Sequence, residues 1–336
     1  MFNLKLLFLA FLALLVLYGC GTKRQYFEPE QIAGKVSFDG SLPSSIVDVA
    51  RDGATLGNGQ IVTKKGLLDI KFPKGFIYFA DDSQRYVAGT RCGELMIVNK
   101  SGDKVFETKF DSAIASVALK DNLLAVVLGA NRLVVVDLKD GNIAMDLKQD
   151  PTYALDSRIA SPYFLSSLIV FPTLDGKLVI VDKDTKKTIR DVVITSDKFF
   201  ANVVFLNVLG DRLVAATKSK VVSINPKSMN YLDSDVKDVV VLENRIFIFT
   251  KDGRVLLTDS DLKVLKERKF KFANFAGAIH GDYIYMIERG GYLIATDLDL
   301  VSVNVYKLPG KIENFLFSSE DTLYYENDYF KLNKKR

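Results

Sequence analysis

Cysteine and histidine build many metal and nucleophilic sites, and this chain of 336 residues contains only two cysteines and one histidine. A structural zinc site needs about four such ligands, so sites of that kind are excluded. The Gly-x-Ser-x-Gly pattern of serine hydrolases does not occur. His280 ends an apolar stretch, residues 275–280, which we interpret as a strand in which the histidine is structural. We therefore predict no catalytic residue, no metal site and no bound cofactor.

Cys20 has the clearest chemistry, because it follows a signal-like N-terminus. Lys5 lies in a short positive segment, and residues 6–17 form an uninterrupted apolar run. This run is shorter than the roughly 20 residues that span a bilayer, and it has the length of the apolar part of a secretory signal. Residues 17–20, Leu-Tyr-Gly-Cys, resemble the bacterial lipobox, although Tyr18 stands where that pattern prefers Ala or Ser. The resemblance implies cleavage before Cys20 and acylation of its thiol, for example with palmitate.

The lipobox divides the chain into a signal peptide at residues 1–19, an acylated tether at residues 20–32 and a folded body at residues 33–336. An ordinary signal peptide with an incidental cysteine is the alternative. Gly21 follows the cysteine, whereas an Asp at this position commonly directs Gram-negative lipoproteins to stay in the inner membrane. We therefore expect a protein anchored to the outer membrane by its acyl chains, with its body facing the periplasm.

The composition is that of a globular protein, with 48% hydrophobic and 26% charged residues. Lys and Arg number 45 against 41 Asp and Glu, which gives a net charge of +4 spread along the chain. The absence of a basic face argues against a nucleic-acid partner. Cys92 is the second cysteine, and its place in the strand-like run of residues 86–92 predicts a small buried apolar residue.

An internal repeat runs through the body of the chain. Six segments share a degenerate Gly-x-Leu-x-x-x-Asp pattern, with apolar residues at the third and fourth positions and Asp or Asn at the seventh. They begin at residues 93, 131, 176, 219, 253 and 291, so successive copies lie 38, 45, 43, 34 and 38 residues apart. The seventh positions are Asn99, Asp137, Asp182, Asn225, Asp259 and Asp297. We expect each copy to be a strand that follows a tight turn and ends in a turn bonded by the Asp or Asn side chain.

Further apolar runs surround each copy and complete a unit of four short strands. One run lies shortly upstream, as in residues 123–128, another lies before it, as in residues 114–119, and a third follows the seventh position, as in residues 104–109. No long window shows a helical stripe that competes with these runs. Four strands every ~40 residues are typical of the blades of a β-propeller. The sequence therefore predicts an all-β propeller.

Weaker copies extend the series to eight blades, with seven as the alternative. Residues 59–62 begin 34 residues before the first strong copy, and residues 322–332 repeat the two middle strands at the C-terminal end. The last blade then lacks its fourth strand. We predict that residues 35–38, Lys-Val-Ser-Phe, pair beside it and close the ring, because closure removes the exposed edges of an open sheet.

The copies at residues 93–106 and 131–143 resemble the PQQ-type propeller repeat. That repeat normally ends in a Trp that packs between blades, whereas this chain has no Trp and carries Phe106 or an aliphatic residue there. A lipobox joined to an eight-bladed propeller of this type resembles the BamB family, a lipoprotein subunit of the machine that assembles β-barrels in the outer membrane. The resemblance implies a non-enzymatic scaffold that assists the assembly and insertion of β-barrel proteins.

One local segment resembles that family more closely. Residues 155–162, Leu-Asp-Ser-Arg-Ile-Ala-Ser-Pro, look like the family's leucine- and arginine-bearing segment, which contacts the POTRA domains of the barrel-assembling subunit. The resemblance carries Leu155 and Arg158 over as partner-binding residues. The long spacing of 45 residues around this segment supports a long loop on one face. A merely longer loop with an exposed arginine is the alternative.

Two other functions stay open as alternatives. The first is a propeller scaffold of another envelope complex, such as a secretion or surface-appendage system. The second is a quinone-dependent dehydrogenase, because PQQ enzymes share this propeller. By resemblance these enzymes need a Trp beneath the quinone, often a disulfide between adjacent cysteines, and a carboxylate-rich calcium site. The lack of Trp and of a second free cysteine disfavours the dehydrogenase.

Overall fold

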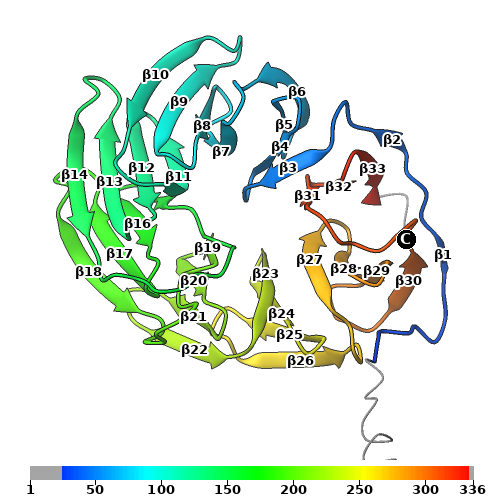
Figure 1. The fold of residues 1–336 in the computed structure, drawn as a ribbon. Helices are drawn as coiled ribbons and strands as arrows, with labels where there is room; N and C mark the ends of the chain where they lie inside the picture. Colours follow the sequence, from blue (N-terminus) through cyan, green and yellow to red (C-terminus); the bar gives the residue numbers. More distant parts are fainter. Residues whose placement is uncertain (1–24, 333–336) are drawn as a thin grey trace, which may run out of the picture.

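The computed structural model describes residues 25–332 as a closed ring of eight antiparallel blades around a central opening (Figure 1). Seven blades have four strands and one has five, and the described residues contain no α-helix. The predicted eight-bladed, all-β propeller is confirmed. Cys20 and the lipobox lie outside the described residues. Within residues 25–332, no helix could cross a membrane.

The first four blades follow one another in chain order, each from the centre outward. Blade 1 consists of β3 (Ile46–Val49), β4 (Gly53–Leu56), β5 (Gln60–Thr63) and β6 (Gly66–Lys71). Blade 2 consists of β7 (Ile77–Asp81), β8 (Arg85–Gly89), β9 (Glu94–Asn99) and β10 (Lys104–Lys109). Blade 3 consists of β11 (Ile114–Lys120), β12 (Leu123–Leu128), β13 (Arg132–Asp137) and β14 (Ile143–Lys148). Blade 4 consists of β15 (Tyr163–Phe164), β16 (Leu168–Pro172), β17 (Lys177–Asp182) and β18 (Thr188–Val193).

The last two of the remaining blades take up strands from the N-terminal side of the chain. Blade 5 consists of β19 (Phe205–Leu209), β20 (Arg212–Ala216), β21 (Lys220–Ile224) and β22 (Met229–Asp233). Blade 6 consists of β23 (Val236–Leu242), β24 (Arg245–Thr250), β25 (Arg254–Asp259) and β26 (Val264–Lys269). Blade 7 consists of β27 (Phe275–His280), β28 (Ile284–Glu288), β29 (Tyr292–Thr296), β30 (Val303–Lys307) and β1 (Gly34–Lys35). Blade 8 consists of β31 (Leu316–Ser318), β32 (Thr322–Tyr325), β33 (Asp328–Lys331) and β2 (Gly40–Ser41).

The core lies between the blades. Strands in the middle of a blade, such as β12, are buried almost throughout, whereas the outermost strand, such as β14, is largely exposed. Eight clusters of buried apolar side chains fill the space, one between each pair of neighbouring blades. Phe106 packs against the cluster between blades 2 and 3, and so occupies the place that the repeat elsewhere gives to Trp. Removing this apolar surface from water holds each blade to its two neighbours.

The predicted side-chain turns are confirmed in all six strong copies. A side-chain oxygen of the seventh residue accepts hydrogen bonds of 2.7 to 3.2 Å from backbone N–H groups of the turn that follows. Gly93 shows why glycine begins a copy, because its φ is +86° and a Cβ there would lie 2.5 Å from the carbonyl oxygen of Phe110. The repeated Asp and Asn residues are therefore used to build turns.

The ring closes through a different N-terminal segment from the predicted one. Residues 35–38 do not complete blade 8, because β2 takes that place, with Gly40 opposite Tyr329 and Ser41 opposite Asp328. A Cβ on Gly40 would lie 2.5 Å from the hydroxyl oxygen of Tyr329, so the closing strand needs a glycine beneath that ring. The backbone N–H of Asp39 also donates to the carbonyl oxygen of Tyr329 over 2.8 Å. Closure by N- and C-terminal strands is confirmed, and its residues are corrected.

The segment before β2 holds the neighbouring blade. β1 pairs in parallel with β30 at the outer edge of blade 7. Upstream of it, Phe27 is only 9% exposed and packs in the cluster between blades 6 and 7. Its ring lies 6.4 Å from that of Phe270 and 5.6 Å from that of Tyr292, with edge-to-face geometry in both pairs. Residues 27–41 therefore fasten blades 7 and 8 from the outside.

Cys92 is exposed, so the prediction of a buried residue is wrong. β8 ends at Gly89, and the turn to β9 begins at Thr90, whose hydroxyl accepts hydrogen bonds from the backbone N–H groups of Cys92 and Glu94. The strand predicted over residues 86–92 thus ends at Gly89, and Cys92 lies in the turn that follows.

Phe27→Ala should lower the free energy of unfolding by about 3 kcal/mol, because the substitution leaves a cavity between blades 6 and 7. Tyr26→Ala is the matched control, since Tyr26 is 64% exposed and its loss should change stability by less than about 0.5 kcal/mol. Urea unfolding measures both variants. Equal losses for the two would contradict the fastening role of Phe27.

Candidate protein-binding face

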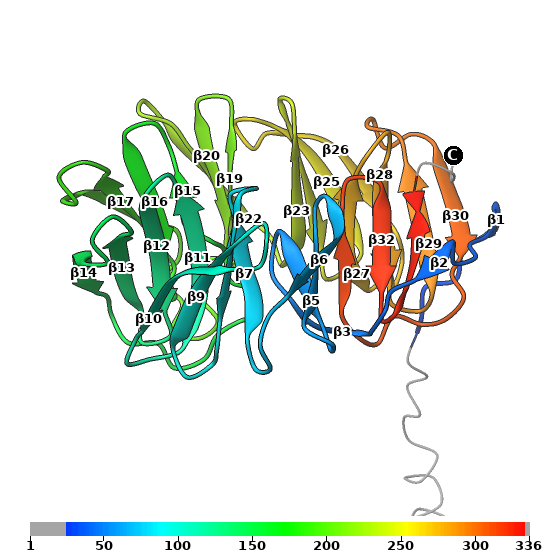
Figure 2. The same ribbon diagram turned by 90° about the horizontal axis from the view of Figure 1, so that it is seen from above.

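Two consecutive loops are the longest connections between strands in the described chain. Residues 149–162 link β14 to β15, and residues 194–204 link β18 to β19. Each joins the outermost strand of one blade to the innermost strand of the next, so both lie on the same face of the ring. We call this side, which carries all such connections, the inter-blade face; Figure 2 shows the strands running between the two faces. The predicted long loop around Leu155 and Arg158 is therefore present.

The two loops are braced against each other by Asn202, which is fully buried. Its side-chain oxygen accepts a hydrogen bond of 2.7 Å from the backbone N–H of Asp156, and its side-chain nitrogen donates to the carbonyl oxygen of Arg158 over 2.7 Å. Nearby, the backbone N–H of Phe200 donates to the carbonyl oxygen of Ala154 over 2.8 Å. Buried polar groups that are fully paired in this way hold loops in one conformation.

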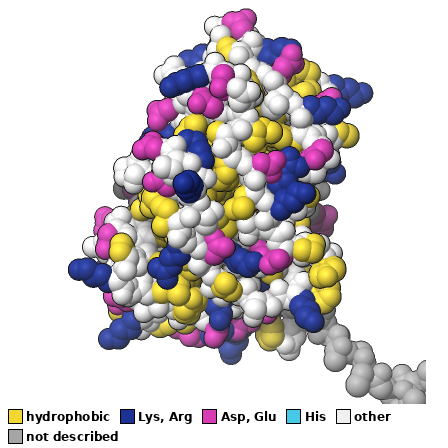
Figure 3. Space-filling model, turned by 90° about the vertical axis from the view of Figure 1, so that its left-hand side faces the viewer, with side chains coloured by type: hydrophobic (Ala, Val, Ile, Leu, Met, Phe, Trp, Pro, Cys, Tyr) yellow, Lys and Arg dark blue, Asp and Glu magenta, His cyan; other side chains and the backbone are white. Residues whose placement is uncertain are grey.

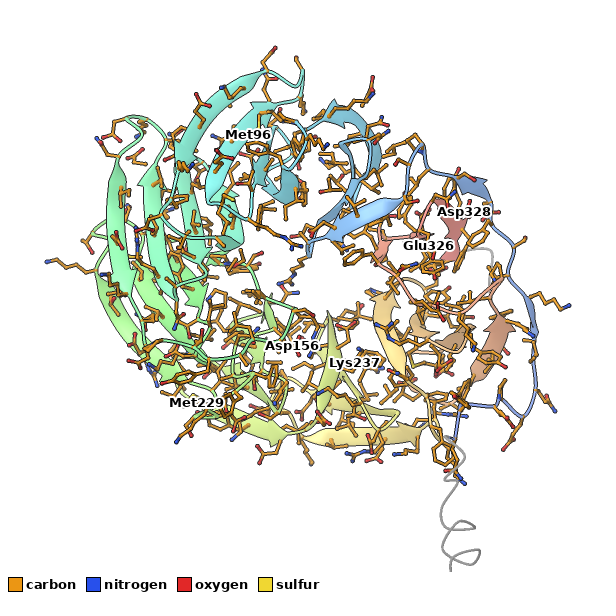
Figure 4. All side chains as sticks on the ribbon, viewed as in Figure 1. Met96, Asp156, Met229, Lys237, Glu326 and Asp328 are labelled. Carbon is orange, nitrogen blue, oxygen red and sulfur yellow. The ribbon has the colours of Figure 1, made fainter. Side chains whose placement is uncertain are left out.

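Arg158 is bound within the fold. Its guanidinium forms an ion pair of 2.6 Å with Asp156 and donates to the backbone carbonyl oxygens of Val236 and Lys237 at the start of β23. Figure 4 shows Asp156 and Lys237 close together on the inner side of the ring. Burial by itself would raise the pKa of Asp156, but hydrogen bonds from Arg158 and its positive charge hold that pKa below its ordinary range. Arg158 thereby ties the loop of blades 3 and 4 to blade 6.

Leu155 is half-buried and packs against the apolar cluster between blades 3 and 4. Neither of the two predicted residues is therefore fully exposed, and both position the loop that carries them. Their contact with a partner stays a prediction, because nothing in the structure tests it.

The two loops expose three large aromatic side chains. Tyr153, Phe199 and Phe200 are 77%, 55% and 42% exposed. The rings of Tyr153 and Phe199 lie 6.2 Å apart, and the ammonium nitrogen of Lys218 lies 4.6 Å from the centre of the Phe200 ring. Sequence reasoning missed these residues. The adjacent phenylalanines after Ser196-Asp197-Lys198, in a segment with no strand pattern, were the available signal.

Charged side chains of both signs gather beside the loops, on the inner side of the ring. Lys237 lies at a bulge of β23, so no residue of the neighbouring strand β24 lies opposite it. It forms no ion pair with any residue from 25 to 332. Burial lowers the pKa of Lys237, and the charges of Arg289 and Arg158 lower it further. The neighbouring Asp238 is half-buried, and desolvation raises its pKa; its carboxyl group accepts a hydrogen bond of 2.8 Å from the backbone N–H of Ala278 in blade 7. This carboxyl group joins blades 6 and 7.

Elsewhere the surface is mixed. Lys and Arg side chains alternate with Asp and Glu over the outer side shown in Figure 3, so this view presents no block of one charge. A groove with a volume of about 600 Å³ lies between blades 8 and 1, lined by Lys64, Tyr324 and Tyr329 among others. Residues 25–332 contain no group of three or more His, Cys, Asp or Glu side chains arranged to hold a metal ion. His280 lies on β27, as predicted.

Comparison with protein families identifies the chain. The family model described as outer membrane protein assembly factor BamB matches residues 44–300, which include most of the ring. The chain belongs to this family. Its repeats are therefore PQQ-type propeller repeats, and this BamB-family chain has the propeller scaffold that the sequence predicts.

Curated relatives of this BamB-family chain carry a different name. Plasminogen-binding protein PgbB of Helicobacter pylori strain J99 is 29% identical over 381 residues, which cover 96% of this chain and 70% of the relative. The protein of the same name from strain 26695 is 30% identical over 380 residues with the same coverage.

Solved structures show the same fold at low sequence identity. BamB from Moraxella catarrhalis has a TM-score of 0.68 at 16% identity, with 88% of this chain and 98% of that chain covered. The C-terminal WD40 domain of Sif2 has a TM-score of 0.67 at 12% identity, with 89% and 99% covered. These structural similarities establish the propeller fold alone.

The ion pair of Asp156 should make stability depend on pH. Its depressed pKa means that its contribution is complete above the ordinary value of 3.8 and disappears as the pH falls through the folded-state value. Asp156→Asn should therefore cost about 1–2 kcal/mol at pH 7, and the difference from the unmodified protein should shrink toward pH 3. Urea unfolding at both pH values measures this, with the exposed Asp184→Asn as control. A deficit of the same size at both pH values would rule out the ion pair as its cause.

Proposed function

We propose that the protein is a non-enzymatic, lipid-anchored scaffold of the bacterial envelope that helps to assemble β-barrel proteins in the outer membrane. The single observation that carries this proposal is the BamB family match over residues 44–300, in a chain whose Cys20 lies in a lipobox-like motif. The partner would be the POTRA domains of the barrel-assembling subunit. The anchor would lie in the outer membrane, with the ring in the periplasm, because Gly21 follows the cysteine.

The inter-blade face is the part of the ring best suited to hold a partner. It carries the two longest loops, and their backbone is fixed by Asn202 and by the ion pair of Asp156 with Arg158. A fixed loop loses little conformational freedom on binding, which favours affinity. In this proposal Leu155 and Arg158 act on the partner mainly by positioning the loop.

A second candidate function follows from the curated relatives. Two Helicobacter pylori proteins that align with 96% of this chain are named for binding plasminogen. Plasminogen binding by this chain would require the ring to be accessible from outside the cell. A scaffold of another envelope complex is the third possibility, and the experiment below separates it by its partners.

Affinity purification from the native envelope after mild crosslinking should recover the barrel-assembling subunit. Arg158→Ala and Leu155→Ala should reduce that recovery severalfold without unfolding the ring, since they loosen the loop, whereas Lys139→Ala on the opposite face should not. Binding of purified plasminogen to the same protein is measured in parallel. Recovery of no barrel-assembly subunit, or of other envelope proteins instead, would exclude the proposed partner.

The exposed thiol of Cys92 reports on which side of the outer membrane the ring lies. A large maleimide that does not cross membranes should label the protein only after the outer membrane is permeabilised. Cys92→Ser is the control for labelling at any other position. Labelling in intact cells would contradict a periplasmic ring and would support the plasminogen-binding alternative.

A further inference from the structure

Three exposed aromatic side chains lie on the two long loops of the inter-blade face, and we call Tyr153, Phe199 and Phe200 the aromatic patch. They come from two loops that follow different blades, yet the rings of Tyr153 and Phe199 lie 6.2 Å apart. No other part of the described chain covers them, and each is more than 40% exposed. Large aromatic side chains gathered in water are unfavourable, and such patches on soluble domains mark interaction sites.

The patch is held in place before any partner binds. The backbone N–H of Phe200 donates to the carbonyl oxygen of Ala154, and Asn202 bonds both peptide groups of the loop at Asp156 and Arg158. The ammonium group of Lys218 rests on the ring of Phe200. Rigid aromatic anchors of this kind dominate binding energy in protein interfaces, because little freedom is lost when they are covered.

Two lysines beside the patch have no carboxylate partner among the described residues. Lys198 is exposed, and neither Lys198 nor Lys218 forms an ion pair within residues 25–332. The nearby carboxylate of Asp197 accepts a hydrogen bond of 2.8 Å from the hydroxyl of Ser219. A partner that carries acidic side chains would complement this surface.

We propose that the aromatic patch, together with Lys198 and Lys218, docks an acidic protein segment that presents aromatic or large aliphatic side chains. This inference rests on the proposed scaffold function and identifies the chemistry of its partner. The apolar side chains of the segment cover the three rings, and its carboxylates pair with the two lysines.

A protein segment fits this surface better than a membrane. The N-terminal strands β1 and β2 lie on blades 7 and 8, across the ring from the loop between blades 3 and 4 (Figure 1). A lipid anchor that precedes these strands would attach the ring at the side remote from the two loops, which would leave the loops accessible to protein.

The test uses the lipoprotein reconstituted in zwitterionic vesicles and a short fluorescent peptide of Glu, Phe and Leu. The acidic peptide should bind at least about tenfold more tightly than the same peptide with Lys in place of Glu. The double variant Tyr153→Ser, Phe199→Ser should weaken binding by about tenfold, and Lys218→Glu should weaken it severalfold. Fluorescence anisotropy measures all of these, with empty vesicles as the blank.

Matched controls come from the same face of the ring. Phe272→Ser and Phe315→Ser replace exposed aromatic residues between blades 6 and 7 and between blades 7 and 8, and they should leave binding unchanged. Circular dichroism and urea unfolding establish that each variant retains the ring. Because the substituted side chains are exposed, their loss should change stability by less than about 0.5 kcal/mol.

Three results would overturn the proposal. They are equal binding of the acidic and basic peptides, unchanged binding by the patch variants, and crosslinking of both loops to a photoactivatable anionic lipid in the absence of peptide. The scaffold function is judged separately by affinity purification. If the unmodified protein and the patch variants recover the barrel-assembling subunit equally well, the scaffold stands and the patch proposal fails. If peptide binding depends on the patch and no subunit is recovered, the patch stands and the assembly function fails.

Discussion

Closure of the ring by the N-terminal segment is the constraint on which the rest of the structure depends. β2 completes blade 8 beside β33, β1 extends blade 7 beside β30, and Phe27 fills the space between blades 6 and 7. Leu42, directly after β2, packs in the cluster between blades 8 and 1. Closure gives every blade two apolar neighbours, and so produces eight equivalent clusters of core side chains where a stack of separate sheets would leave exposed edges.

A ring that is stabilised between its blades leaves its loops free to vary. The turns within blades are short and are bonded by Asp or Asn, so they have little spare length for function. Extra length gathers in the two loops that enter and leave blade 4, where Asn202 and the Asp156–Arg158 pair fix their backbone. The resulting surface holds exposed aromatic rings on a fixed backbone, beside lysines that form no ion pair within the described residues. Such a surface suits recognition of another protein.

The comparisons identify the family of the chain, whereas the geometry concerns the surface that a partner could contact. The family match establishes a BamB-type propeller. The Helicobacter relatives are named for binding plasminogen, whereas the Moraxella structure is named BamB. A propeller of this kind can hold different partners, because its loops change without disturbing the blades. The partner therefore has to be sought in the chemistry of the inter-blade face, which carries the loops at residues 149–162 and 194–204.

The sequence by itself determined the blades, because their hydrogen bonds and turns are local and repeat along the chain. The eightfold repeat, the Asp and Asn turns and closure by the two ends were all predictable from it. Only the tertiary structure decided which residues close the ring, since Gly40 is selected by the Tyr329 ring that lies against it. Likewise Cys92 lies past the end of its strand, and Arg158 binds carbonyl groups of blade 6 that are distant in sequence. The aromatic patch joins two loops separated by a whole blade, and no local pattern records a contact that the curvature of the ring creates.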